Sequence, residues 1–202
     1  LTFATILIST SGALGKFIDL PAPVIIWGRS ALGALFLFIF CRYKKLSIKI
    51  KSSKDFPTIL LSALLLGTHW VTYFYALKLS NVAIGMLSLF TFPVITALLE
   101  PLFTKTKLNR IHILLALMVL LGIYILVPDL NFENTYIKGI LIGVFSALCY
   151  ALRNLILKRH VHKYNGTVLM MQQVLIVSIF LLPVMFKMDI SNIQAQIPYL
   201  II

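Results

Sequence analysis

Charged side chains are scarce in this chain of 202 residues. Asp, Glu, Lys and Arg together make up 12% of it, and only six residues are acidic. Soluble globular domains carry about 25% charged residues. Hydrophobic residues account for 60% of the chain and the mean hydropathy is +0.98. This composition excludes a water-soluble globular domain and indicates a membrane protein.

Cysteine is almost absent, which excludes a disulfide-stapled fold. The two cysteines, Cys41 and Cys149, fall in apolar runs, and no Cys/His spacing suggests a metal site. We expect both to be packing residues. No nucleophile-and-base motif and no Gly-rich phosphate loop is found, so the sequence argues against an enzyme.

Long apolar runs fill most of the chain. A bilayer core of about 30 Å needs about 20 apolar residues per helix, and seven such runs are followed by the start of an eighth. The expected spans are residues 2–18, 22–41, 57–78, 82–103, 111–128, 136–158 and 166–186, with IPYLII opening the eighth. We predict an all-α, multi-pass membrane helix bundle. Because the chain begins at Leu1 and stops inside an apolar run, we expect it to be a piece of a longer polypeptide.

Basic residues gather in alternate loops. The loops after the second, fourth and sixth expected spans hold twelve of the 18 Lys and Arg residues. The positive-inside rule places these loops in the cytoplasm. We therefore expect a multi-pass protein of the plasma membrane or bacterial inner membrane. On this view the net charge of +12 needs no nucleic-acid partner.

A weak internal repeat has an offset of 144 residues. It aligns VIIWGRSALG, from Val24, with VLMMQQVLIV, from Val168. An odd repeat of five helices would place the second copy upside down, as in the inverted repeats of secondary transporters. We expect a first repeat over residues 1–130 and the start of a second, truncated repeat over 136–202.

The segments GTHWVTYFYALKLSNVA (67–83), FPVITALLEPLF (92–103) and LMVLLGIYILV (117–127), together with Arg29, carry a family resemblance. The chain resembles EamA-type permeases of the drug/metabolite transporter superfamily over essentially all its residues. The resemblance implies ten helices in an inverted five-plus-five repeat, of which about seven and a half are present here. It also implies no metal or nucleotide cofactor and the movement of small metabolites, often amino acids and often outward. One departure is the run FTKTKL (103–108), where such permeases commonly carry an acidic residue.

Arg29 is the charged residue in the apolar run of residues 24–40. An arginine at the centre of a spanning helix costs about 2.5–3.5 kcal/mol. At 1.5 Å per residue it lies about 10 Å into its helix, so we expect it to face the protein interior or a water-filled cavity. It is either an anchor for a substrate carboxylate, which a guanidinium binds bidentately, or a structural arginine that bonds helix-end carbonyls or a nearby carboxylate.

Midspan aromatic residues mark the third expected helix. Helical spacing puts Trp70, Tyr73 and Phe74 on one stripe with His69 beside it. The stripe is either ordinary packing or a cavity wall. His69 is either a hydrogen-bonded core histidine or a residue that takes part in proton coupling.

Other polar residues within the spans are weaker candidates. Glu100 either carries a coupling proton or pairs with basic loop residues such as Lys105, and Arg153 lies near enough to a helix end to snorkel. Pro93 should kink the fourth helix by interrupting its hydrogen bonds. Small residues that include Gly28, Gly33, Gly139 and Gly143 predict close helix packing. Further cavity candidates are Ser11, Thr91 and Gln173.

The favoured function is therefore a secondary transporter that works by alternating access on a small-molecule substrate in the lipid bilayer. The alternative is a membrane channel or a structural membrane protein without carrier activity. A channel would be favoured by charge rings or a pore-lining repeat, which the sequence does not display. A homodimer is compatible with the sequence.

Overall fold

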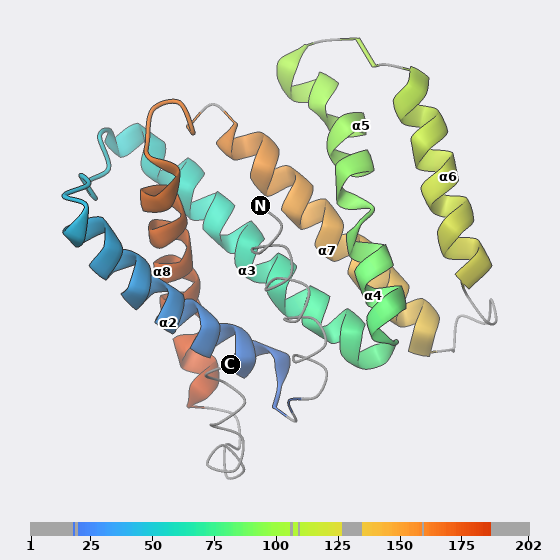
Figure 1. Cartoon of the computed structure of the whole chain (residues 1–202), viewed down its shortest axis with the longest axis horizontal. Helices are drawn as coiled ribbons and strands as arrows, with labels where there is room; N and C mark the ends of the chain where they lie inside the picture. The colour runs from blue at the N-terminus through green and yellow to red at the C-terminus, as the bar shows by residue number, and fades with distance from the viewer. Residues whose placement is uncertain are drawn as a thin grey trace. The chain divides into compact units, whose positions relative to one another are not determined.

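The chain forms apolar helices joined by short connections (Figure 1). The computed structural model describes residues 18, 20–105, 107–108, 110–126, 135–158 and 160–186, and these contain no strand. The helices are α2 (Ala22–Tyr43), η1 (Ser53–Asp55), α3 (Phe56–Leu79), α4 (Val82–Leu89), α5 (Phe92–Thr104), α6 (Arg110–Leu126), α7 (Thr135–Leu157) and α8 (Gly166–Met185). The expected first span and the IPYLII segment lie outside the described residues.

The predicted all-α, multi-pass membrane architecture is confirmed in its coarse form. Within the described residues, five helical segments are long and apolar enough to cross a membrane. They are α2, α3 with the η1 turn ahead of it, α4 with α5, α7, and α8. Helix α6 is shorter, with 17 residues. The ten-helix inverted repeat stays a prediction.

The fourth expected span is two helices. Helix α4 ends at Leu89 and α5 begins at Phe92, with Pro93 in the first turn of α5. Proline suits this position because the first N–H groups of a helix have no partner within the helix. The Thr91 hydroxyl donates a hydrogen bond of 2.7 Å to the Ser88 carbonyl at the break. The Thr91 side chain therefore bonds a backbone carbonyl at the point where the helical hydrogen bonds are interrupted.

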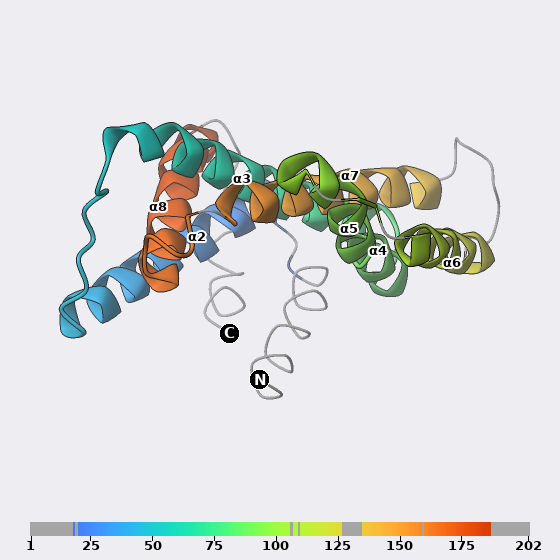
Figure 2. The same ribbon diagram turned by 90° about the horizontal axis from the view of Figure 1, so that it is seen from above.

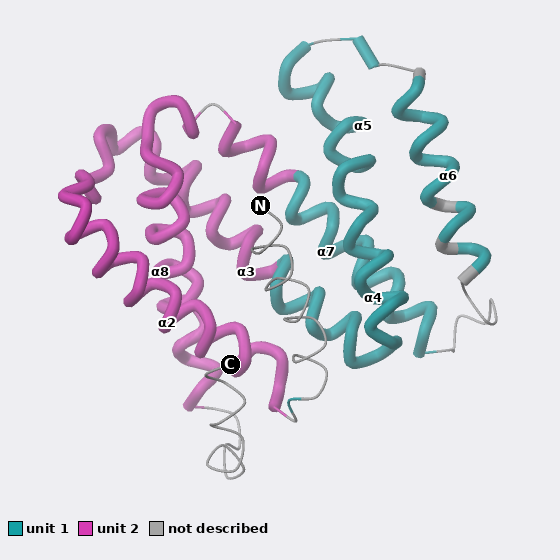
Figure 3. Tube along the Cα trace, viewed as in Figure 1, with its two compact units in different colours: residues 1–19, 69–151 teal, residues 20–68, 152–202 magenta. Residues whose placement is uncertain are grey.

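The helices form two compact units (Figure 3). Unit 1 comprises residues 1–19 and 69–151, and unit 2 comprises residues 20–68 and 152–202. Helices α3 and α7 therefore contribute one part to each unit. Each unit also combines segments of both expected repeats, whose boundary stays a prediction.

In unit 1, the second half of α3 runs antiparallel to the first half of α7, and the two helices approach closely at glycines. A Cβ on Gly139 would lie 2.8 Å from the Ser80 Cβ, and one on Gly143 would lie 2.6 Å from the Ser88 Cβ of α4. The predicted close packing is confirmed here. Helix α6 lies beside α4 and α5 in the same unit and contacts both (Figure 2).

In unit 2, α2 lies along α8. Cys41, with no exposed surface, packs against Val168 and Met171. The prediction of close packing at Gly28 and Gly33 of α2 is wrong within the described residues, because a Cβ on either would meet nothing within 4 Å. Ser30 and Ala34, two further small residues expected to pack in the same helix, are buried.

Candidate functional site

The centre of unit 1 holds a polar pair between α3 and α7. The Nδ1 atom of His69 lies 2.8 Å from the Ser146 Oγ and 3.1 Å from the Ser146 carbonyl oxygen. The Ser146 hydroxyl donates in turn to the His69 carbonyl at 2.7 Å. His69 is 5% exposed and Ser146 is fully buried. The pair therefore links two apolar helices through polar atoms removed from water.

These partners assign the tautomer of His69. A carbonyl oxygen can only accept, so Nδ1 carries the hydrogen that points toward Ser146. The Ser146 hydroxyl then accepts from Nδ1 and donates to the His69 carbonyl. Protonation of the ring would add its hydrogen at Nε2. The arrangement thus holds the ring in place between α3 and α7.

Aromatic rings surround the pair. The His69 ring stacks on Tyr150 at 4.7 Å between centroids and lies 6.3 Å from Tyr73. Tyr150 meets Phe92 of α5 edge-on at 4.9 Å, and Tyr73 meets Phe74 edge-on at 5.8 Å. Tyr73 and Phe74 are buried. The remaining member of the expected stripe, Trp70, is half-buried. We call His69, Tyr73, Ser146, Tyr150 and Phe92 the unit 1 centre.

Unit 2 holds a second buried polar group. Gln173 of α8, with no exposed surface, accepts a short hydrogen bond from the Arg153 guanidinium and donates at 2.7 Å to Ser62 of α3. We expected Arg153 to snorkel toward the membrane surface. It is half-buried and its guanidinium donates to Gln173 of α8 instead.

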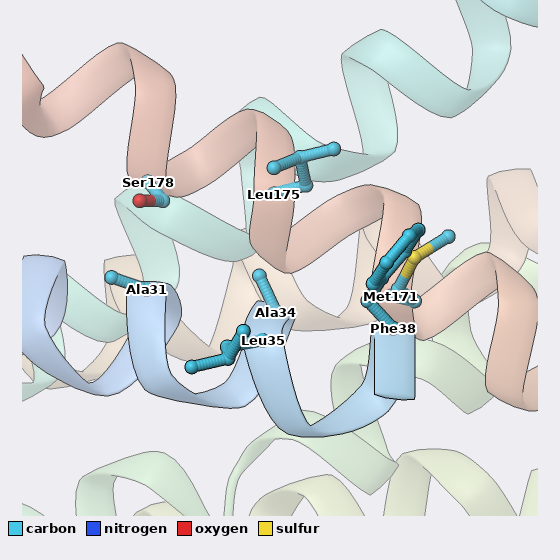
Figure 4. A pocket seen from close by; sticks show the side chains of 7 residues that line it. All are labelled: Ala31, Ala34, Leu35, Phe38, Met171, Leu175 and Ser178. Carbon is cyan, nitrogen blue, oxygen red and sulfur yellow. The ribbon is translucent and has the colours of Figure 1, made fainter. Parts of the chain in front are cut away.

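Arg29 lies on the first part of α2 with its side chain exposed. It is not among the residues that line the hollow of about 290 Å³ between α2 and α8 (Figure 4). The lining residues are Ala31, Ala34, Leu35, Phe38, Met171, Leu175 and Ser178. Nearly all of this lining is apolar, so the hollow offers few groups that could orient a polar substrate.

The remaining candidates are not members of the unit 1 centre, and the Thr91 side chain bonds a backbone carbonyl. The Thr91 hydroxyl is occupied at the α4–α5 break. Glu100 is half-buried on α5, and its carbonyl accepts from Thr104 at 2.9 Å. Pro93 opens α5. Ser11 lies outside the described residues.

Sequence reasoning did not single out four members of these clusters, which are Ser146, Tyr150, Phe92 and Ser62. Ser146 and Tyr150 are one helical turn apart on α7. The spacing of a hydroxyl and a ring at i and i+4 was the pattern in the sequence that could have indicated them. Ser62 had no signal beyond being a polar residue within an apolar run. In each case the partner lies on another helix, far away in sequence.

Comparison with known proteins places the chain in a family. The model of the EamA-like transporter family matches residues 1–127. The protein named "Pseudopaline exporter CntI" of Pseudomonas aeruginosa is 26% identical over 148 residues, which cover 71% of this chain and 51% of that protein. A protein named "Uncharacterized transporter" of Helicobacter pylori is also 26% identical over 148 residues, covering 69% of this chain and 49% of its own length.

The chain thus spans about half the length of the curated relatives it matches. No solved structure matches it. The family model covers well over half of the chain and agrees with its apolar helices. This chain belongs to the EamA-like transporter family.

Proposed function

We propose that the protein is a secondary transporter that moves small metabolites of the amino-acid class outward across the cell membrane by alternating access. The observation that carries the proposal is the unit 1 centre, a buried polar pair ringed by aromatic side chains inside apolar helices. Polar groups within a bilayer are costly and are commonly retained for function. Membership of a transporter family supports the same conclusion.

The substrate class and direction have separate support. One relative carries the printed name of an exporter, which favours outward movement. In unit 1, the stacked rings of His69 and Tyr150 provide a flat, amphipathic wall. Arg29, in unit 2, is a separate candidate whose guanidinium is suited to a carboxylate. A zwitterionic amino acid carries the carboxylate that such a guanidinium binds.

Proton coupling and orientation complete the proposal. His69 is the proposed proton carrier because it is an ionisable side chain buried within a membrane-spanning helix, and Glu100 is a second candidate. The distribution of basic residues supports cytoplasmic placement of the loops after α2, α5 and α7.

Counterflow tests the proposal. Proteoliposomes that contain the purified protein are loaded with unlabelled amino acids, and single labelled amino acids are then added outside. We expect transient accumulation of one or a few labelled compounds above the level in protein-free liposomes. A folded protein that accumulates none of them would refute the amino-acid class. Uptake without counterflow would favour the channel, and no uptake of any solute would favour a structural membrane protein.

A further inference from the structure

A carboxylate in unit 2 ties together two connections that are distant in sequence. Asp55, in the η1 turn at the end of the α2–α3 connection, forms an ion pair with Lys163 of the α7–α8 connection. Its Oδ2 atom also accepts from the Tyr164 hydroxyl at 2.6 Å. The His160 Nε2 lies 3.5 Å from its Oδ1. The Asp55 side chain is only 14% exposed, so these groups replace most of its water.

The same two connections meet at further points. The backbone N–H of Lys51 donates to the Tyr164 hydroxyl at 3.0 Å, and the Lys51 ammonium donates to the Lys163 carbonyl at 2.9 Å. The Tyr164 ring is buried against Ile59 and Leu169. The Tyr164 hydroxyl therefore joins Asp55 and the Lys51 backbone while its ring anchors the contact to the apolar interior.

The contact has a consequence if the helices move. The α2–α3 connection belongs to the expected first repeat, and the α7–α8 connection belongs to the expected second repeat. Alternating access largely rocks one repeat against the other around a central site. A contact between the repeats at one membrane face must then break whenever that face opens.

We propose that Asp55, Lys163 and Tyr164 form a latch that holds this membrane face of the protein closed. The proposal rests on the proposed alternating-access function. Lys51 reinforces the latch through the Tyr164 hydroxyl and the Lys163 carbonyl. Breaking the latch raises the population in which the ends of α2 and α8 separate.

Cys41 is a native reporter for this opening. It has no exposed surface and packs against Val168 and Met171 of α8. Leu46 and Ile48, in the connection that leads to Asp55, cover the same cluster. Separation of the two connections would uncover the Cys41 thiol, whereas Cys149 lies buried in unit 1.

The test measures thiol labelling of Cys41 in a Cys149→Ser background. The protein is held in lipid nanodiscs, which expose both membrane faces, so the result does not depend on orientation. We expect Asp55→Asn and Tyr164→Phe each to accelerate labelling by about three- to tenfold. Each substitution removes a charged or buried hydrogen bond of the latch, and this loss shifts the equilibrium between the closed and the open form by about that factor. Tyr164→Phe keeps the buried ring. The control is Lys54→Gln, which changes a charge in the same connection beside Asp55.

A double variant sharpens the test. Asp55→Asn combined with Lys163→Gln should label no faster than Asp55→Asn alone, because both changes remove one contact. Labelling of the latch variants at the rate of Lys54→Gln would overturn the proposal.

A second reporter separates latch opening from general loosening. In a Cys41→Ser background, Cys149 should stay protected in the latch variants. Equal deprotection of Cys149 would also overturn the proposal, because the substitutions would then loosen the whole fold. The proposed function fails separately, by absence of counterflow in the unmodified protein, which leaves the labelling comparison intact.

Discussion

Removal of the Ser146 hydroxyl should weaken the link between α3 and α7. Ser146→Ala deletes the group that accepts from the His69 Nδ1 at 2.8 Å and donates to the His69 carbonyl at 2.7 Å. The Ser146 carbonyl, 3.1 Å from Nδ1, remains as an acceptor. The imidazole is therefore not left as a buried donor without a partner, which limits the loss.

The size of the effect follows from two hydrogen bonds. A typical intramolecular hydrogen bond contributes about 1 kcal/mol net, and bonds between membrane helices average about 0.6 kcal/mol. The expected destabilisation is thus about 1–2 kcal/mol. For a protein of this size, each kcal/mol corresponds to a shift of about 2–4 °C in the midpoint of thermal unfolding.

The assay is thermal unfolding in detergent, with a matched substitution as control. Ser178→Ala deletes the same hydroxyl from a half-buried serine that lines the α2–α8 hollow. Ser146→Ala should unfold at a lower temperature than Ser178→Ala. In a double-mutant cycle, Ser146→Ala and His69→Ala should be non-additive by about 0.6–1 kcal/mol, the share of the side-chain bond alone, because His69→Ala keeps the backbone carbonyl that Ser146 also bonds. Additive losses would refute the assigned pair.

Three further predictions follow from other parts of the chain. Gly143→Ala should cost about 1–3 kcal/mol in stability because its Cβ would lie 2.6 Å from a serine Cβ of α4. Gly28→Ala should lower stability far less in the same thermal assay, because its Cβ would meet nothing within 4 Å among the described residues. Arg29→Gln should lower transport of zwitterionic substrates more than it lowers folded yield, and equal losses in both would indicate a structural arginine. The hydrogen bond to the Asp55 carboxylate raises the pKa of Lys163, so less of its amine is neutral at a given pH. Its acylation, followed by mass spectrometry, should be slower in the unmodified protein than in Asp55→Asn, and equal rates would refute the bond.

Much of the fold could be predicted because the bilayer constrains the length of each apolar helix. The bilayer sets a minimum apolar length, and residues 22–41 and 166–186 correspond closely to α2 and α8. The break near Pro93 could also be anticipated from its missing N–H group. Glycine packing was harder. Gly143 contacts α4 while Gly28 meets nothing among the described residues, and this difference depends on neighbouring helices that spacing within one helix does not reveal.

The site was only partly predictable for the same physical reason. His69 stood out as a midspan ionisable residue, and such residues need a partner. Its partner Ser146 lies 77 residues away, and Lys163 lies 108 residues from Asp55. Long-range pairs of this kind are set by how helices and connections meet. The local pattern can mark one member of a pair without identifying the other.

Trans-stimulation separates transport by a carrier from passage through a channel. Proteoliposomes are loaded with a labelled substrate found by counterflow, and efflux is timed with and without unlabelled substrate outside. We expect faster efflux when external substrate is present, because a loaded binding site returns across the membrane in exchange. Efflux at one rate under both conditions, through folded protein, would contradict alternating access and indicate a channel.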